Sequence, residues 1–133
     1  MSLNNPVNEY LTTKNESALA DASPHKLIEM LLDGALESIA KATGALTADN
    51  VVVLGESLGK AVSIVDSLQA MLDGDRGGEI AGNLGQLYEY IGRRLLQVSR
   101  DRDPEILREV AGLLREIKSG WDEMPPELKS ASG

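Results

Sequence analysis

Apolar residues recur along this chain at the alternating spacings of three and four that mark one face of an α-helix. They do so in four successive stretches, 24–46, 51–72, 79–98 and 104–122. The principal stripe residues are Ile28, Leu32, Ala35, Ile39, Ala42 and Leu46, then Leu54, Leu58, Ala61, Val65, Leu68 and Leu72, then Ile80, Leu84, Leu87, Tyr88, Ile91, Leu95 and Val98, and finally Leu107, Val110, Leu114, Ile117 and Trp121. Four amphipathic segments joined by short links predict an all-α protein, an antiparallel up-down four-helix bundle.

Start and stop signals divide these stretches. Ser23-Pro24 and Asp103-Pro104 each place a side-chain oxygen before a proline, which is the pattern of an N-cap followed by the first helical residue. The stretch 73–78, D-G-D-R-G-G, is expected to break the chain between the second and third helices, because glycine readily adopts positive φ. Pro125-Pro126 is expected to end the fourth helix.

The chain of 133 residues predicts a single domain with two outer segments: a mobile N-terminal cap segment, helical or extended, over 1–22, the bundle over 23–122 and a polar tail over 123–133. Val7, Tyr10 and Leu11 would share one helix face in the cap segment. Burying three such side chains yields roughly 1.5–3 kcal/mol each, against about 1–2 kcal/mol per residue for ordering the backbone. The two contributions nearly cancel, which predicts a cover that attaches weakly and can be displaced. A frayed terminus without a role is the alternative.

Composition excludes several classes of partner. The formal net charge of −8 disfavours nucleic acid, whose phosphates require a basic face, and also disfavours anionic membranes. No apolar run reaches the length of about 18 residues that membrane insertion needs. The first ten residues lack the pattern of a signal peptide. With no cysteine available for disulfides or thiol chemistry, a cytoplasmic location is expected.

Residues for catalysis or metal binding are missing from the sequence pattern. His25 is the only histidine, with no glutamate three residues before it, so the Glu-x-x-His pairs of a di-iron bundle cannot form. The stretch 73–84 opens as Asp-x-Asp, but Gly77 and Leu84 stand where a calcium loop needs a ligand and a bidentate glutamate. We therefore expect no enzyme, no metal site and no cofactor, with His25 a solvated residue of the first helical turn.

Two features indicate a second surface beyond the bundle core. Seven of the glycines inside the predicted helices each cost about 0.8–1 kcal/mol relative to alanine. Either they allow close helix contacts inside the bundle or they form a shallow notch that receives another helix. The third helix also spreads apolar residues over a wide arc, so that its two tyrosines cannot both face one narrow core. The glycines are Gly34, Gly55, Gly59, Gly82, Gly85, Gly92 and Gly112, and the arc consists of Leu84, Leu87, Tyr88, Tyr90 and Ile91.

The sequence resembles the flagellin-specific export chaperone family, FliS. The resemblance rests on Tyr10, on A-S-P-H-K-L-I-E-M-L-L-D-G-A at 22–35 and on G-G-E-I-A-G-N-L-G-Q-L-Y-E-Y-I at 77–91, and it continues through R-R-L-L at 93–96 to Trp121. Leu32 departs from the family, which more often has an aromatic residue there.

The resemblance implies a cytoplasmic chaperone that binds the disordered C-terminal region of flagellin, prevents its premature polymerisation and delivers it to a flagellar export gate component. In this family the N-terminal segment lies over part of the client groove, which gives Val7 and Tyr10 that role here. The free chain is expected to be a monomer or weak dimer. The alternative is a self-associating structural bundle without a flagellin client.

Overall fold

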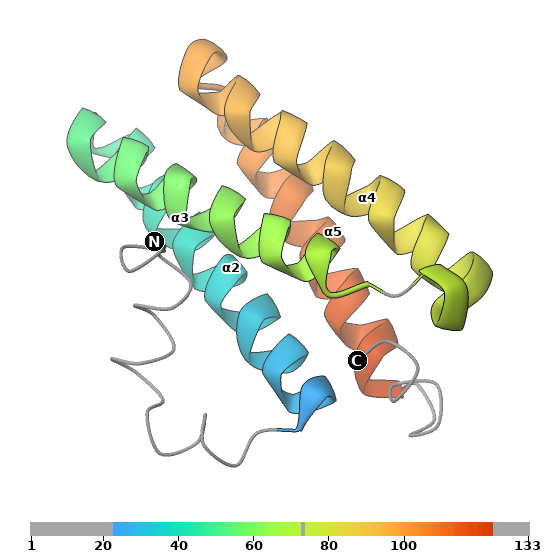
Figure 1. The fold of residues 1–133 in the computed structure, drawn as a ribbon. Coiled ribbons are helices and arrows are strands. Elements are labelled where there is room, and N and C mark those ends of the chain that lie inside the picture. The colour runs from blue at the N-terminus through green and yellow to red at the C-terminus, as the bar shows by residue number, and fades with distance from the viewer. Residues whose placement is uncertain (1–22, 73, 124–133) are drawn as a thin grey trace, which may run out of the picture.

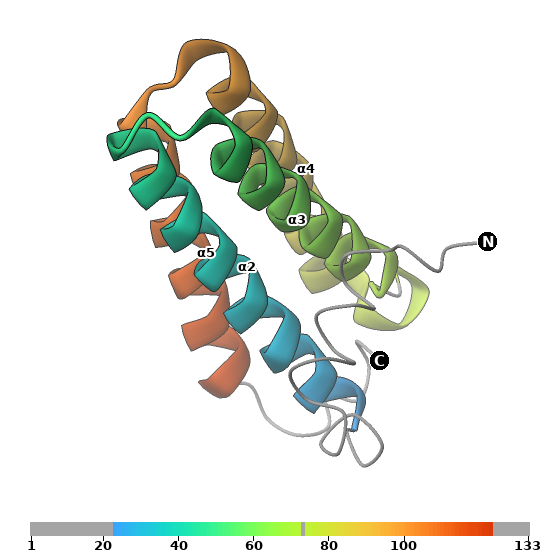
Figure 2. The same cartoon turned by 90° about the vertical axis from the view of Figure 1, so that its left-hand side faces the viewer.

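Four α-helices packed side by side make up the computed structural model, which describes residues 23–72 and 74–123 (Figure 1). They are α2 (Pro24–Thr47), α3 (Val51–Ala70), α4 (Gly74–Asp101) and α5 (Pro104–Glu123). Successive helices run in opposite directions, as the two views show (Figures 1 and 2). Each helix packs against two others, α2 and α4 both contacting α3 and α5. The antiparallel four-helix bundle is confirmed.

Side-chain caps begin the helices where the sequence places them. The Ser23 hydroxyl accepts a hydrogen bond from the Lys26 backbone N–H at 3.3 Å, and Pro24 follows it. The Asp103 carboxylate accepts from the backbone N–H of Glu105 at 2.9 Å. Each cap gives a partner to a backbone donor that the first helical turn leaves unpaired.

Two non-glycine residues in left-handed conformations make the turns at one end of the bundle. Asp49, with φ 54°, is the left-handed residue of a Schellman motif. In this motif the N–H of the next residue, Asn50, donates to the Ala45 carbonyl at 2.8 Å. Arg102, with φ 51°, ends α4 with its N–H donating to the Val98 carbonyl at 2.8 Å. These compact turns reverse the chain without a long loop.

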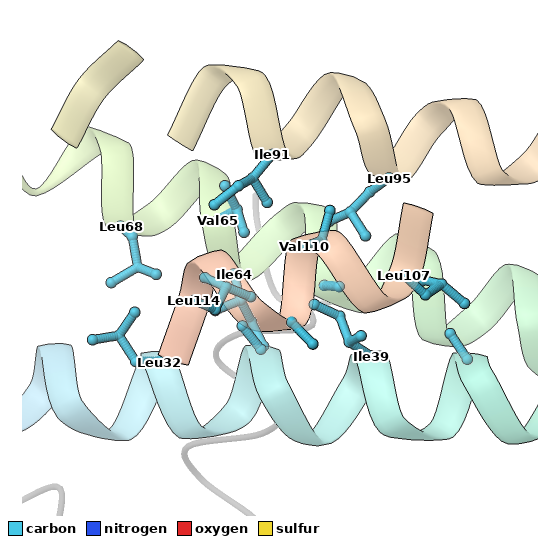
Figure 3. Packing of buried hydrophobic residues seen from close by; sticks show 14 of the residues in the cluster. Leu32, Ile39, Ile64, Val65, Leu68, Ile91, Leu95, Leu107, Val110 and Leu114 are labelled. Atoms are coloured by element: carbon cyan, nitrogen blue, oxygen red, sulfur yellow. The ribbon is translucent and has the colours of Figure 1, made fainter. Parts of the chain in front are cut away.

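The predicted stripes form the core. Ile39 of α2, Ile64 of α3, Ile91 of α4 and Leu114 of α5 are each at most 1% exposed and meet between the four helices (Figure 3). Every one of these side chains is aliphatic, in keeping with the absence of phenylalanine from the chain. Packing along the stripes therefore holds the four helices in register.

The expected break over 73–78 is wrong in its extent. Helix α4 already begins at Gly74, and α3 ends at Ala70, so the link is much shorter than six residues. Glycine costs a helix only about 1 kcal/mol relative to alanine. Extending a helix that already exists adds one backbone hydrogen bond per residue, which opposes that modest cost.

The helix glycines do not serve close helix packing in most cases. A Cβ added at Gly55, Gly59, Gly82, Gly92 or Gly112 would meet no atom within 4 Å. Gly85 differs, because a Cβ there would lie 3.6 Å from Leu72 Cδ1, and Gly34 is buried. The first five glycines therefore face open space, so packing inside the described bundle does not account for them.

Candidate functional site: an apolar pocket at one end of the bundle

A pocket of about 280 Å³ opens at the end of the bundle where α2 begins and α5 ends. All four helices contribute to its wall. The lining residues are Ile28, Leu32, Leu68, Met71, Leu72, Leu84, Tyr88, Glu116, Ile117, Gly120 and Trp121. Because helices in an up-down bundle alternate in direction, this end collects the start of α2 and α4 and the end of α3 and α5.

One wall of the pocket is fixed by contacts between α2 and α5. The indole Nε1 of Trp121 donates to the His25 carbonyl at 3.2 Å, which orients the ring beside the first turn of α2. One turn before Trp121 on α5, Lys118 forms an ion pair with Asp33. Trp121 is only 4% exposed, so its ring is a well-packed part of this wall.

The opposite wall comes from α3 and α4. Gln69 Nε2 donates to the Gly85 carbonyl at 3.3 Å and ties the end of α3 to α4. Leu72 packs beside Gly85, where an added Cβ would make an ordinary van der Waals contact of 3.6 Å with Leu72 Cδ1. Met71 and Leu72 are half-buried beyond the last turn of α3, where a partner could still cover them.

The pocket is suited to apolar groups rather than to ions. Of its described lining residues only Glu116 carries a formal charge. Burial raises the pKa of the Tyr88 phenol to about 12, so this side chain stays neutral at physiological pH. Among the side chains that the structure describes, no three His, Cys or acidic residues gather in a way that could hold a metal ion. The geometry fits an inserted aliphatic or aromatic side chain.

The structure brings two of the predicted site residues together in this pocket. Leu84 is half-buried and Tyr88 is 2% exposed, and both line it. Leu87 is half-buried beside the core without lining the pocket, and Ile91 is fully buried in the core.

Tyr90 lies apart from the pocket, as the helical angle between the two tyrosines predicts. Its hydroxyl donates to Glu109 Oε2 of α5 at 2.6 Å, and Arg94 Nε donates to Glu109 Oε1 at 2.9 Å. These hydrogen bonds, that of Tyr90 first, lower the pKa of the Glu109 carboxyl, and the same bond raises the pKa of Tyr90. Tyr90 thus joins α4 to α5 at the surface. The predicted cap residues Val7, Tyr10 and Leu11 lie outside the described residues.

Sequence reasoning missed most of the pocket, because it placed the candidate residues on 79–98 and the N-terminal segment alone. The contributions of α2, α3 and α5 include Ile28, Met71 and Trp121. A signal was present: in an up-down bundle these residues stand at helix ends that share one end of the bundle.

No helix among the described residues has the length and apolar character needed to cross a membrane.

Comparisons with known proteins agree with the resemblance in the sequence. The family model described as flagellar protein FliS matches residues 6–128. A flagellar secretion chaperone FliS of Salmonella typhimurium is 45% identical over 122 residues, 91% of this chain and 90% of that relative. Flagellar secretion chaperone FliSB of Pseudomonas aeruginosa is 44% identical over 114 residues, covering 86% and 90%. The flagellar secretion chaperone FliS of Vibrio cholerae is 42% identical over 118 residues, covering 89% of this chain and 87% of that relative. Chaperones of this family are not enzymes, in agreement with the expectation from the sequence.

Proposed function

Since the chain belongs to the flagellar protein FliS family, we propose that it is a cytoplasmic export chaperone for flagellin. It binds the disordered C-terminal region of flagellin, prevents premature polymerisation and delivers the client to a component of the flagellar type III export gate. The client folds into helices as it binds, and the entropy cost of ordering it offsets part of the favourable contact energy. The complex is therefore weak enough for the client to be released.

The observation that carries this proposal is the open apolar pocket formed by Leu84, Tyr88 and their neighbours from the other three helices. An amphipathic client helix inserts one apolar side chain there and lays its remaining apolar face along the neighbouring helix surfaces. Burying one such side chain contributes roughly 1.5–3 kcal/mol. Several anchors of that size are enough for a useful affinity once the ordering cost is subtracted.

Outward-facing glycines support a receiving surface on α3 and α4. Gly55 and Gly59 are four residues apart and share one face of α3, while Gly92 lies on α4. The bundle gains nothing from these positions, since an added Cβ would meet no atom. Their absent side chains let a client helix approach the backbone closely.

The N-terminal segment acts as the displaceable cover of this surface. Val7, Tyr10 and Leu11 precede α2, whose first turns line the pocket through Ile28. The cover and the client compete for the same apolar surface, so the free chain is a monomer or weak dimer rather than a tight oligomer. Leu87 and Tyr90 contribute to the client surface, and Ile91 supports it from the core.

The single tryptophan provides the test, because Trp121 lines the pocket. Titration with a tryptophan-free peptide of the flagellin C-terminal region should change its emission saturably at a one-to-one ratio. Leu84→Ala should weaken the affinity about 5- to 30-fold, the equivalent of roughly 1–2 kcal/mol. Leu113→Ala is the matched control: this half-buried leucine packs on the core away from the pocket and should leave the affinity unchanged. Equal effects of the two changes, or an emission that does not respond, would contradict the proposal.

A further inference from the structure

A second groove runs between α2 and α5, apart from the pocket at the bundle end. It has a volume of about 340 Å³. Its floor is apolar: Ile39 and Leu107 are each 1% exposed and Ala111 is 9% exposed. The Thr43 hydroxyl donates to the Ile39 carbonyl at 2.9 Å, so the donor of this side chain is already satisfied without a polar partner in the groove.

Two arginines of α5 line this groove. Arg108 and Arg115 are seven residues apart, so they stand on one face of the helix roughly 10 Å apart along its axis. Both are exposed, and Arg108 pairs with Glu105 on the same helix. Among the described side chains, Arg115 has no ion-pair partner. Arg115 therefore places an uncompensated positive charge beside the apolar floor, and Arg108 a second guanidinium that is shared with Glu105, in a chain whose net charge is −8.

We propose that the α2–α5 groove docks an amphipathic helix of a partner protein that carries two carboxylates seven residues apart beside its apolar stripe. Seven residues are two turns, so carboxylates at this spacing match the separation of Arg108 and Arg115. The apolar stripe covers Leu36 and Ala111 on the two sides of the groove. Arginine presents a planar fork of donors that suits carboxylates.

Other occupants fit the charge pattern less well. In a two-fold symmetric dimer through this groove the same surface meets itself, which brings the two arginines of one copy toward those of the other. Nucleic acid requires a far more extended basic surface than two arginines. The docking surface is independent of the proposed flagellin site, since it shares none of the pocket's described lining residues.

The test uses two designed, fluorescein-labelled amphipathic peptides of about 18 residues with the same leucine stripe. One carries glutamates seven residues apart beside the stripe and the other carries lysines at those positions. Fluorescence anisotropy should show saturable binding of the glutamate peptide to the full chain, weakening as salt is raised, and no binding of the lysine peptide. Arg115→Glu should weaken binding roughly tenfold or more. Arg93→Glu makes the same charge change on exposed α4 surface and should have no effect.

Several results would overturn the proposal. Equal binding of both peptides would show that the arginines do not select carboxylates. Equal losses of affinity for Arg115→Glu and Arg93→Glu would show that the charge at position 115 has no specific role. A melting temperature lowered by Arg115→Glu alone would mean that a segment of this chain already covers the groove. Sedimentation showing a dimer that Arg115→Glu dissociates would assign the groove to a second copy.

Discussion

Replacing outward-facing glycines with alanine should stabilise the free chain and weaken client binding. Gly55→Ala, Gly59→Ala and Gly92→Ala each remove a helix penalty of about 0.8–1 kcal/mol. Open space surrounds the added methyl group at all three positions, so no packing cost offsets the gain. Together the three changes should raise the free energy of unfolding by roughly 2–3 kcal/mol, the sum of the three helix penalties.

Urea and thermal unfolding followed by circular dichroism measure this gain. For a chain of this size a gain of 1 kcal/mol corresponds to about 3–5 °C in melting temperature, so the triple variant should melt roughly 6–15 °C higher. Its affinity for the flagellin C-terminal peptide should fall, because three methyl groups obstruct the close approach of a client helix.

Gly112→Ala on α5 supplies the matched control. This glycine also faces open space, but it does not belong to the proposed client surface on α3 and α4. It should stabilise the chain by about 0.8–1 kcal/mol and leave client affinity unchanged. A triple variant that is no more stable than the parent would refute the reasoning on the bundle. A stabilised variant that binds the client normally would refute the notch.

Three further predictions concern single residues. Tyr10→Ala should change client binding with little change in melting temperature, because this residue lies outside the four-helix core, whereas Leu58→Ala, in the core at 4% exposure, should cost about 2–5 kcal/mol of stability; similar losses of melting temperature would contradict the cover role. Ultraviolet titration should show one phenol ionising near pH 12, absent from Tyr88→Phe. Because burial raises this pKa above its ordinary value of 10.0, the associated stability is complete below pH 10 and is lost as the pH rises through 12. The Glu109 pKa is lowered, so its carboxylate stabilises the fold above the ordinary value of 4.5 and less as the pH falls through the folded pKa. Glu109→Gln should therefore lose less stability than the parent between pH 7 and pH 3 in urea unfolding, and an unchanged pH dependence would contradict the Arg94–Glu109–Tyr90 interaction.

The bundle was predictable from sequence because its helices are specified locally. The stripe that includes Leu32 and Ile39 repeats with helical spacing, and Ser23 and Asp103 mark helix starts with side chains that do cap them. The extent of the link after α3 was not predictable in the same way. Glycine propensity is a weak preference, and helix extension overrides it at Gly74.

The candidate site was predictable only in part, because it is assembled from residues distant in sequence. Leu84 and Tyr88 were found, since they stand on one helix within a wide apolar arc. Trp121 and Met71 were not, because their place in the pocket depends on how the ends of four helices come together. Whether a glycine points into the bundle or outward likewise depends on which helix faces pack together. A local sequence pattern does not contain this information.

The measurement that tests the chaperone account most directly is a titration of this chain with the flagellin C-terminal fragment, followed by calorimetry and circular dichroism. The account predicts one-to-one binding, a negative heat-capacity change from apolar burial, and more helix in the complex than in the two separate proteins. No heat over a range of temperatures, with both proteins confirmed soluble, or a complex whose spectrum is the sum of its parts, would contradict it.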